Sequence, residues 1–88
     1  MCTYQTANVA VSGSGKGAGG WFPLAAATVY FDHPVDAPAD HTLNIDFRNP
    51  DRGPAARVAV ELDPAGAREL AEAILAMLAA APRGLIEA

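Results

Sequence analysis

The sequence predicts an α+β domain: a four-stranded antiparallel meander followed by one C-terminal helix that packs on one face of the sheet. Three observations support this fold class. Apolar and polar residues alternate in four separate segments, as in half-buried strands. Short turns rich in glycine, proline and aspartate separate these segments, which favours antiparallel neighbours. The last third of the chain instead has apolar residues at helical spacing.

The four predicted strands cover residues 2–12, 24–33, 41–49 and 57–62. The third is the clearest, because Leu43, Ile45 and Phe47 fall on one side of it and polar residues fall between them. Turns are predicted at residues 13–20, 34–40 and 50–54, where glycine, proline and aspartate are concentrated.

The apolar sides of the strands also predict the register of the sheet, because its buried face must be continuous. The expected cross-strand pairs are Phe31 with Leu43, Val29 with Ile45, Leu43 with Leu62, Ile45 with Val60, and Phe47 with Val58. This register brings His33 opposite His41 at the mouth of the second hairpin. The antiparallel first hairpin brings Cys2 to the same end.

Asp63 and Pro64 predict the start of the helix, since aspartate is a favoured N-cap and proline a favoured first helical residue. The helix is expected to run to about Ala81 and to stop at Pro82 and Gly84. Its predicted core stripe consists of Ala67, Leu70, Ala71, Ile74 and Leu78.

The second half of this helix, residues 73–81, has no polar residue on any side. A helix that is apolar all round is normally buried all round, and one small sheet covers only one stripe. Leu75, Met77 and Ala80 therefore predict a further partner, and we expect a homodimer. The thin, alanine-rich core agrees, because such small domains often need a metal or a second subunit.

The segment "VSGSGKGAGGW", residues 11–21, is the most motif-like run of the chain. A phosphate-binding P-loop needs G-x-x-x-x-G-K-[ST] between a strand and a helix. Here Ala10 stands at the first glycine position, Gly17 stands at the Ser/Thr position, and a strand is predicted to follow. We interpret the segment as a flexible hairpin loop that binds no nucleotide.

Length, charge and cysteine count narrow the class of protein. The 88 residues predict a single domain, residues 1–88. A net charge of −4 argues against nucleic-acid binding, which needs clustered Lys and Arg. The single cysteine excludes an internal disulfide, and no apolar run is long enough to span a bilayer. We therefore expect a soluble cytoplasmic protein with no membrane or nucleic-acid partner.

Cys2, His33 and His41 form the first candidate site. All three are expected at one end of the sheet, and thiolate and imidazole are preferred ligands of zinc and other late transition metals. Removal of Met1 would place a free amine beside the Cys2 thiol. Zinc is the default metal, with copper and iron as alternatives. The competing interpretation is two solvated histidines and a small buried cysteine.

The sheet face away from the helix forms the second candidate site. Its polar residues include five candidates for binding a small ligand: Tyr30, Asp46, Arg48, Arg57 and Glu61. Arg48 and Arg57 would lie directly opposite one another, which is unfavourable unless acids or an anion lie between them. The alternative interpretation is an ordinary solvated outer face.

Four stretches carry a family resemblance: "MCTY", "VSGSGKGAGGWFPL", "ATVYFDHPVDAPADHTLNIDFRNP" and "ARVAVELDP". Through them, nearly the whole chain resembles a family of short uncharacterised bacterial proteins described only as a domain of unknown function. The resemblance implies a bacterial stand-alone domain and transfers no catalytic role to any residue.

The sequence leaves three functions open. The leading one is a small metal-binding protein with a role in sensing, storage or small redox or hydrolytic chemistry. The second is a metal-free homodimeric module that binds a partner protein or a small ligand. The third is a small enzyme that uses the Cys2 thiol as nucleophile, and whether the protein is an enzyme is left undecided.

Overall fold

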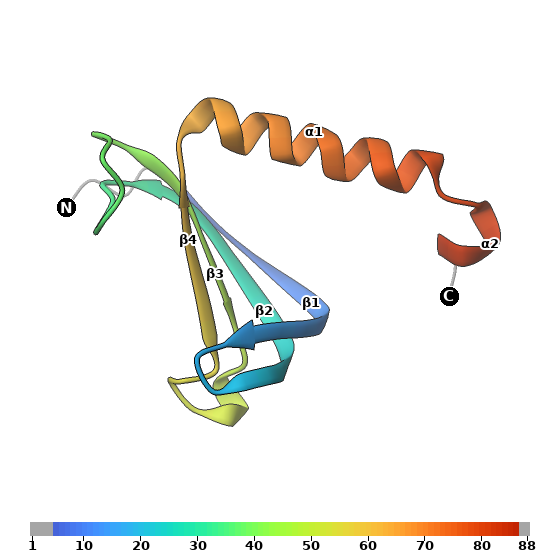
Figure 1. The fold of residues 1–88 in the computed structure, drawn as a ribbon, viewed down its shortest axis with the longest axis horizontal. Coiled ribbons are helices and arrows are strands. Elements are labelled where there is room, and N and C mark those ends of the chain that lie inside the picture. The colour runs from blue at the N-terminus through green and yellow to red at the C-terminus, as the bar shows by residue number, and fades with distance from the viewer. Residues whose placement is uncertain (1–4, 87–88) are drawn as a thin grey trace.

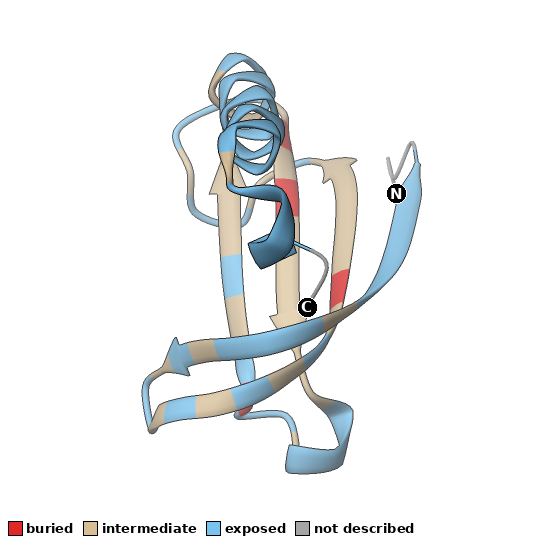
Figure 2. Ribbon diagram, turned by 90° about the vertical axis from the view of Figure 1, so that its right-hand side faces the viewer, coloured by how far each residue is buried: buried red, intermediate tan, exposed pale blue. Residues whose placement is uncertain are grey.

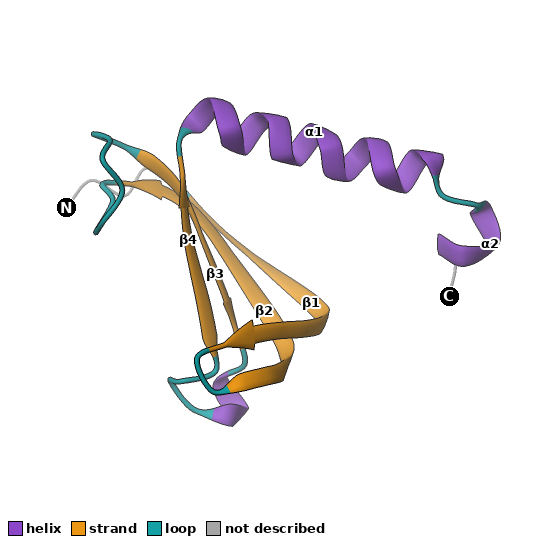
Figure 3. Ribbon diagram, viewed as in Figure 1, coloured by secondary structure: helices purple, strands orange, loops and turns teal. Residues whose placement is uncertain are grey.

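The computed structural model describes residues 5–86. Four antiparallel strands form one sheet in the order β1-β2-β3-β4, and two helices follow, so the predicted meander with a C-terminal helix is confirmed (Figures 1 and 3). The elements are β1 (Thr6–Gly17), β2 (Gly20–Asp32), β3 (Thr42–Arg48), a 3-10 turn (Pro50–Arg52), β4 (Arg57–Leu62), α1 (Pro64–Ala80) and α2 (Arg83–Ile86).

The predicted register is confirmed at every apolar pair between β2, β3 and β4. Phe31 pairs with Leu43, and Val29 pairs with Ile45. Leu43, Ile45 and Phe47 in turn pair with Leu62, Val60 and Val58. A shift of one residue would move every apolar side chain to the polar face, so the alternation leaves one acceptable register.

The first hairpin differs from its prediction. Residues 13–20 are not a flexible loop, because β1 continues to Gly17, β2 begins at Gly20, and only two residues lie between them. The register shifts between Ala10 and Gly13, which marks a β-bulge where one extra residue of β1 is absorbed. Beyond it Gly15 pairs with Phe22, so the glycine-rich segment is an extended arm of the sheet.

The limits of the other predicted strands change by a few residues. The second strand starts four residues earlier than predicted and ends at Asp32, and β3 is one residue shorter at each end. The fourth strand has the predicted limits.

The start of α1 agrees with its prediction. The Asp63 carboxylate accepts a hydrogen bond from the Gly66 backbone N–H at 3.2 Å, and Pro64 occupies the first turn. The helix ends at Ala80, close to the predicted end. Gly84 does not mark the end of helical structure, because it lies inside the short helix α2. Within residues 5–86, no helix combines the length and the hydropathy of a membrane span.

The packing of α1 corrects the predicted core. The helix leaves the end of β4 and runs out to one side of the sheet (Figure 1), and among the strands it contacts β3 most. Of the predicted stripe, Leu70, Ile74 and Leu78 are 46–53% exposed, and no residue of α1 is buried (Figure 2). Among the described apolar residues only Ala27 and Ala56 are buried.

The single chain is therefore far more open than a folded monomer of its size. It exposes 6553 Å², whereas a compact monomer of 9.1 kDa exposes about 4,900 Å². Its radius of gyration is 14.5 Å, against about 12 Å for a compact domain of this length. The helix that stands away from the sheet contributes to both differences (Figure 1).

Candidate functional site

The two histidines meet at the open end of the β2–β3 hairpin. Their ring centroids are 4.4 Å apart and the rings are tilted by 34°. His41 also stacks on Phe31, with centroids 5.7 Å apart. The predicted proximity of His33 and His41 is thus confirmed, and it follows from the register, because Asp32 and Thr42 form the last cross-strand pair.

Two hydrogen bonds orient His33. Its backbone N–H donates to the Asp32 carboxylate at 2.7 Å, and its ring Nδ1 lies 3.0 Å from the carbonyl oxygen of Asp40. A carbonyl oxygen only accepts, so this bond puts the proton of a neutral ring on Nδ1 and leaves the lone pair on Nε2. Metal-binding histidines in proteins are commonly oriented in this way.

The described residues do not complete a metal site by themselves. Within residues 5–86 no group of three or more His, Cys, Asp or Glu side chains is arranged to hold an ion. Cys2, the third predicted ligand, lies outside the described residues. His33 and His41 are therefore the two candidate ligands for which the structure gives a position.

The polar face of the sheet carries a hollow of about 470 Å³. Four of the five predicted ligand-binding residues line it: Tyr30, Asp46, Arg57 and Glu61. Arg48 does not, and instead donates a hydrogen bond at 2.9 Å to the hydroxyl of Thr28. The Val35–Ala37 segment of the β2–β3 loop forms part of the wall of this hollow.

Glu61 fastens that loop to the sheet. Its carboxylate accepts hydrogen bonds from three successive backbone N–H groups, those of Val35, Asp36 and Ala37. These bonds favour the charged carboxylate and hold the pKa of Glu61 below its usual value of 4.5. The sequence pattern placed Glu61 on the polar face but contained no signal that it would bind the loop.

The two arginines are directly opposite one another, as the register predicted. Arg57 pairs with the Asp46 carboxylate at 2.8 Å, and Arg48 is directed to Thr28. Both guanidinium groups therefore have a partner within the sheet face, and an additional anion is not needed to hold them there.

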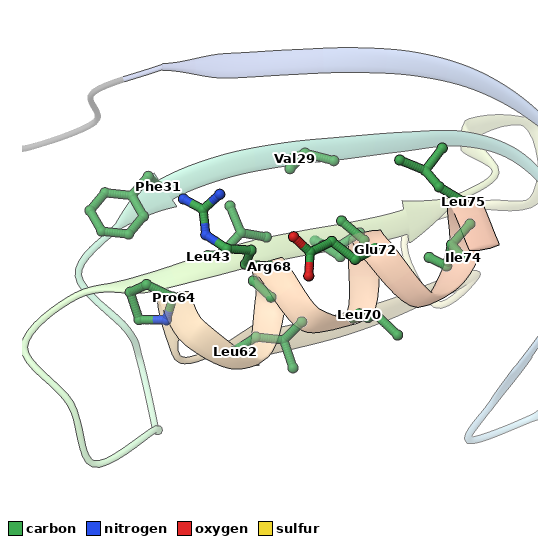
Figure 4. A pocket seen from close by; sticks show the side chains of 13 residues that line it. Val29, Phe31, Leu43, Leu62, Pro64, Arg68, Leu70, Glu72, Ile74 and Leu75 are labelled. Atoms are coloured by element: carbon green, nitrogen blue, oxygen red, sulfur yellow. The ribbon is translucent and has the colours of Figure 1, made fainter.

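A groove of about 540 Å³ lies between α1 and the apolar face of the sheet (Figure 4). The sheet lines it with Val29, Phe31, Leu43, Ile45 and Leu62. The helix lines it with Ala67, Leu70, Ala71, Ile74 and Leu75, together with two charged residues, Arg68 and Glu72. The sequence prediction missed this groove, because it placed the helix flat on the sheet. The apolar second half of the helix did indicate that a further partner covers it.

Fold and sites together define a small α+β domain with a polar hollow on one side of its sheet and an open apolar groove on the other. The chain belongs to the family of unknown function DUF6295, whose model matches residues 1–87. The family resemblance seen in the sequence is thus confirmed. Comparison with curated proteins found no match, and neither did comparison with solved structures.

Proposed function

We propose that the protein is a homodimeric interaction module. A second copy covers the apolar groove, and the polar face stays free for a partner protein or a small ligand. One observation carries the proposal: the single chain buries polar residues and exposes apolar ones. Thr42 and Asn44 are 0% and 4% exposed, whereas Ile74 and Leu75, which line the groove, are 52% and 68% exposed. A large exposed apolar groove of this kind marks an interaction surface.

A second copy suits the groove because each chain supplies both halves of the contact. The sheet wall is apolar, and the helix wall is apolar apart from one arginine and one glutamate. A two-fold axis brings the same surface patch of both chains together, so a patch that is complementary to itself closes into a dimer. The polar hollow lies on the opposite sheet face and remains accessible in such a dimer.

Sedimentation at micromolar concentration tests this proposal. We expect twice the chain mass of 9.1 kDa for the native protein. Leu75→Glu puts a charge into the groove and should shift the mass towards that of the monomer. Val35→Glu is the matched control, because Val35 is 98% exposed and lies outside the groove, and it should leave the dimer intact. A native protein that sediments as a monomer would falsify the proposal.

A second candidate function is transition-metal binding at His33 and His41, with the Cys2 thiol as a further ligand. The close rings and the oriented His33 support it. A tetrahedral zinc ion bound to one nitrogen of each ring, about 2.1 Å away, holds the two ring centroids roughly 5 Å apart. The observed centroids, at 4.4 Å, are slightly closer than that. Zinc is again the default, with copper and iron as alternatives.

Elemental analysis of protein purified without a histidine tag tests the metal proposal. We expect near-stoichiometric metal in the native protein and little in His33→Ala, His41→Ala and Cys2→Ser. Asp36→Asn is the control, because the Asp36 backbone rather than its side chain fastens the loop, and it should retain the metal. The metal proposal fails if the native protein is metal-free and added zinc, copper or iron leaves its melting temperature and thiol reactivity unchanged.

A further inference from the structure

We infer that the dimer is built by helix exchange: the second half of α1 from each protomer lies in the partner's groove, between the partner's sheet and the partner's own helix. This inference rests on the proposed self-association and specifies its geometry. The resulting order of layers is sheet, partner helix, own helix and partner sheet. Two features of the chain lead to this arrangement, and a third permits it.

The first feature is the distribution of apolar residues around α1. The groove has two apolar walls, so its occupant must be apolar on two opposite sides. Residues 73–81 meet this requirement, because they include no polar side chain. Leu75 and Met77 point to nearly opposite sides of the helix, since two residues correspond to a turn of about 200°. A dimer made by sheet faces alone would leave one of these sides in water.

The second feature is the amount of surface. The chain exposes roughly 1,600 Å² more than a compact monomer of its mass. A stable interface of ordinary size buries about 800 Å² per partner, and obligate homodimers bury more. Contacts at the groove rim alone would leave most of this excess exposed. Insertion of a helix between sheet and helix covers both walls and the helix itself, which accounts for an excess of this size.

The third feature is charge. Arg68 and Glu72 lie on the helix wall and extend into the groove (Figure 4). Residues four apart lie on the same face of a helix, so these two opposite charges can pair with each other when the partner helix covers them. The helix wall can therefore accept the partner helix without leaving an unpaired buried charge.

Cross-linking of mixed chains tests the exchange. In a Cys2→Ser background, one chain carries Ile45→Cys on the sheet wall and the other carries Met77→Cys on the helix. The two are unfolded, mixed, refolded and treated with a short thiol cross-linker. Because each chain has one cysteine, every cross-link joins two chains. We expect a covalent heterodimer of the Ile45→Cys and Met77→Cys chains, and none when Val35→Cys replaces Ile45→Cys.

The possible outcomes separate the inference from the proposal on which it rests. A dimer that cross-links only between two Ile45→Cys chains has sheets face to face, which overturns helix exchange and leaves the homodimer proposal standing. A chain that sediments as a monomer overturns both.

Discussion

At the scale of single residues, Glu61 has the best-defined role in the structure. Its carboxylate accepts three backbone N–H groups of the β2–β3 loop, and charge-assisted bonds of this type are stronger than neutral ones. The loop in turn forms a wall of the polar hollow. The Glu61 side chain on β4 thus holds the loop, and with it one wall of the hollow, against the sheet.

This role predicts a pH dependence of stability. The pKa of Glu61 is lower in the folded chain than its usual 4.5, so its contribution is complete above that value and is lost as the pH falls through the lowered pKa. We expect Glu61→Gln to melt at a lower temperature than the native protein at pH 7, with the difference shrinking below about pH 4.5. Thermal melts from pH 7 to pH 3 measure this.

Glu69→Gln is the control for that experiment, because Glu69 lies exposed on α1. It should follow the native protein throughout the pH range. A deficit of Glu61→Gln that stays constant down to pH 3 would contradict the assigned role of the carboxylate.

Gly53 supplies a second prediction at this scale. It ends the 3-10 turn with φ = +88° and ψ = 173°, a conformation that residues with a Cβ rarely adopt. Gly53→Ala should therefore destabilise the protein by about 1–3 kcal/mol, measured by urea unfolding. Gly19→Ala is the matched control, since Gly19 has no positive φ and an added Cβ there meets nothing within 4 Å. Equal effects of the two substitutions would rule out backbone strain as the cause.

At the scale of elements, the glycine-rich arm is built differently from a phosphate-binding loop. Its residues pair across the hairpin, Lys16 with Trp21 and Gly17 with Gly20, and a strand follows instead of a helix. Backbone N–H groups in such a ladder are engaged in the sheet and do not converge on a phosphate, as they do in a P-loop.

We therefore expect Lys16→Ala to change stability by less than about 0.5 kcal/mol, as for an ordinary surface substitution. Millimolar ATP should not raise the melting temperature of either protein. Micromolar ATP binding by the native protein that disappears in Lys16→Ala would show that the arm does bind phosphate.

At the scale of the whole molecule, the exposed groove predicts that folding and association are coupled. We expect the chain to be unstable alone, because within residues 5–86 only Ala27 and Ala56 are buried among the apolar residues. In an obligate dimer the melting temperature rises with concentration, since mass action favours the associated state.

A hundredfold rise in concentration stabilises such a dimer by about 2.7 kcal/mol, which corresponds to a rise of roughly 5–10 °C in melting temperature for two chains of this length. Calorimetry at about 2 μM and about 200 μM measures this difference. A melting temperature that is independent of concentration would contradict coupled folding and association.

Outside the glycine-rich segment and α2, the sequence by itself determined the secondary structure, the strand order and the register of β2, β3 and β4. Leu43, Ile45 and Phe47 alternate strictly, and a strand with one apolar face has one register that keeps that face together. The same register was sufficient to bring His33 beside His41. Asp63 and Pro64 identified the start of the helix, because capping depends on residues that are adjacent in the chain.

Only the tertiary structure decided the path of the glycine arm, the role of Glu61 and the position of α1. Glycine is permissive, so the same residues fit an open loop or a bulged strand, and pairing with residues 20–24 decides between them. Glu61 binds a loop some 25 residues away in the chain, a separation at which no periodicity operates. The direction of α1 depends on its short connection to β4 at Asp63 and on which surfaces of the helix and the sheet are covered. Alternation specifies an apolar face but leaves open whether the chain's own helix or another chain covers it.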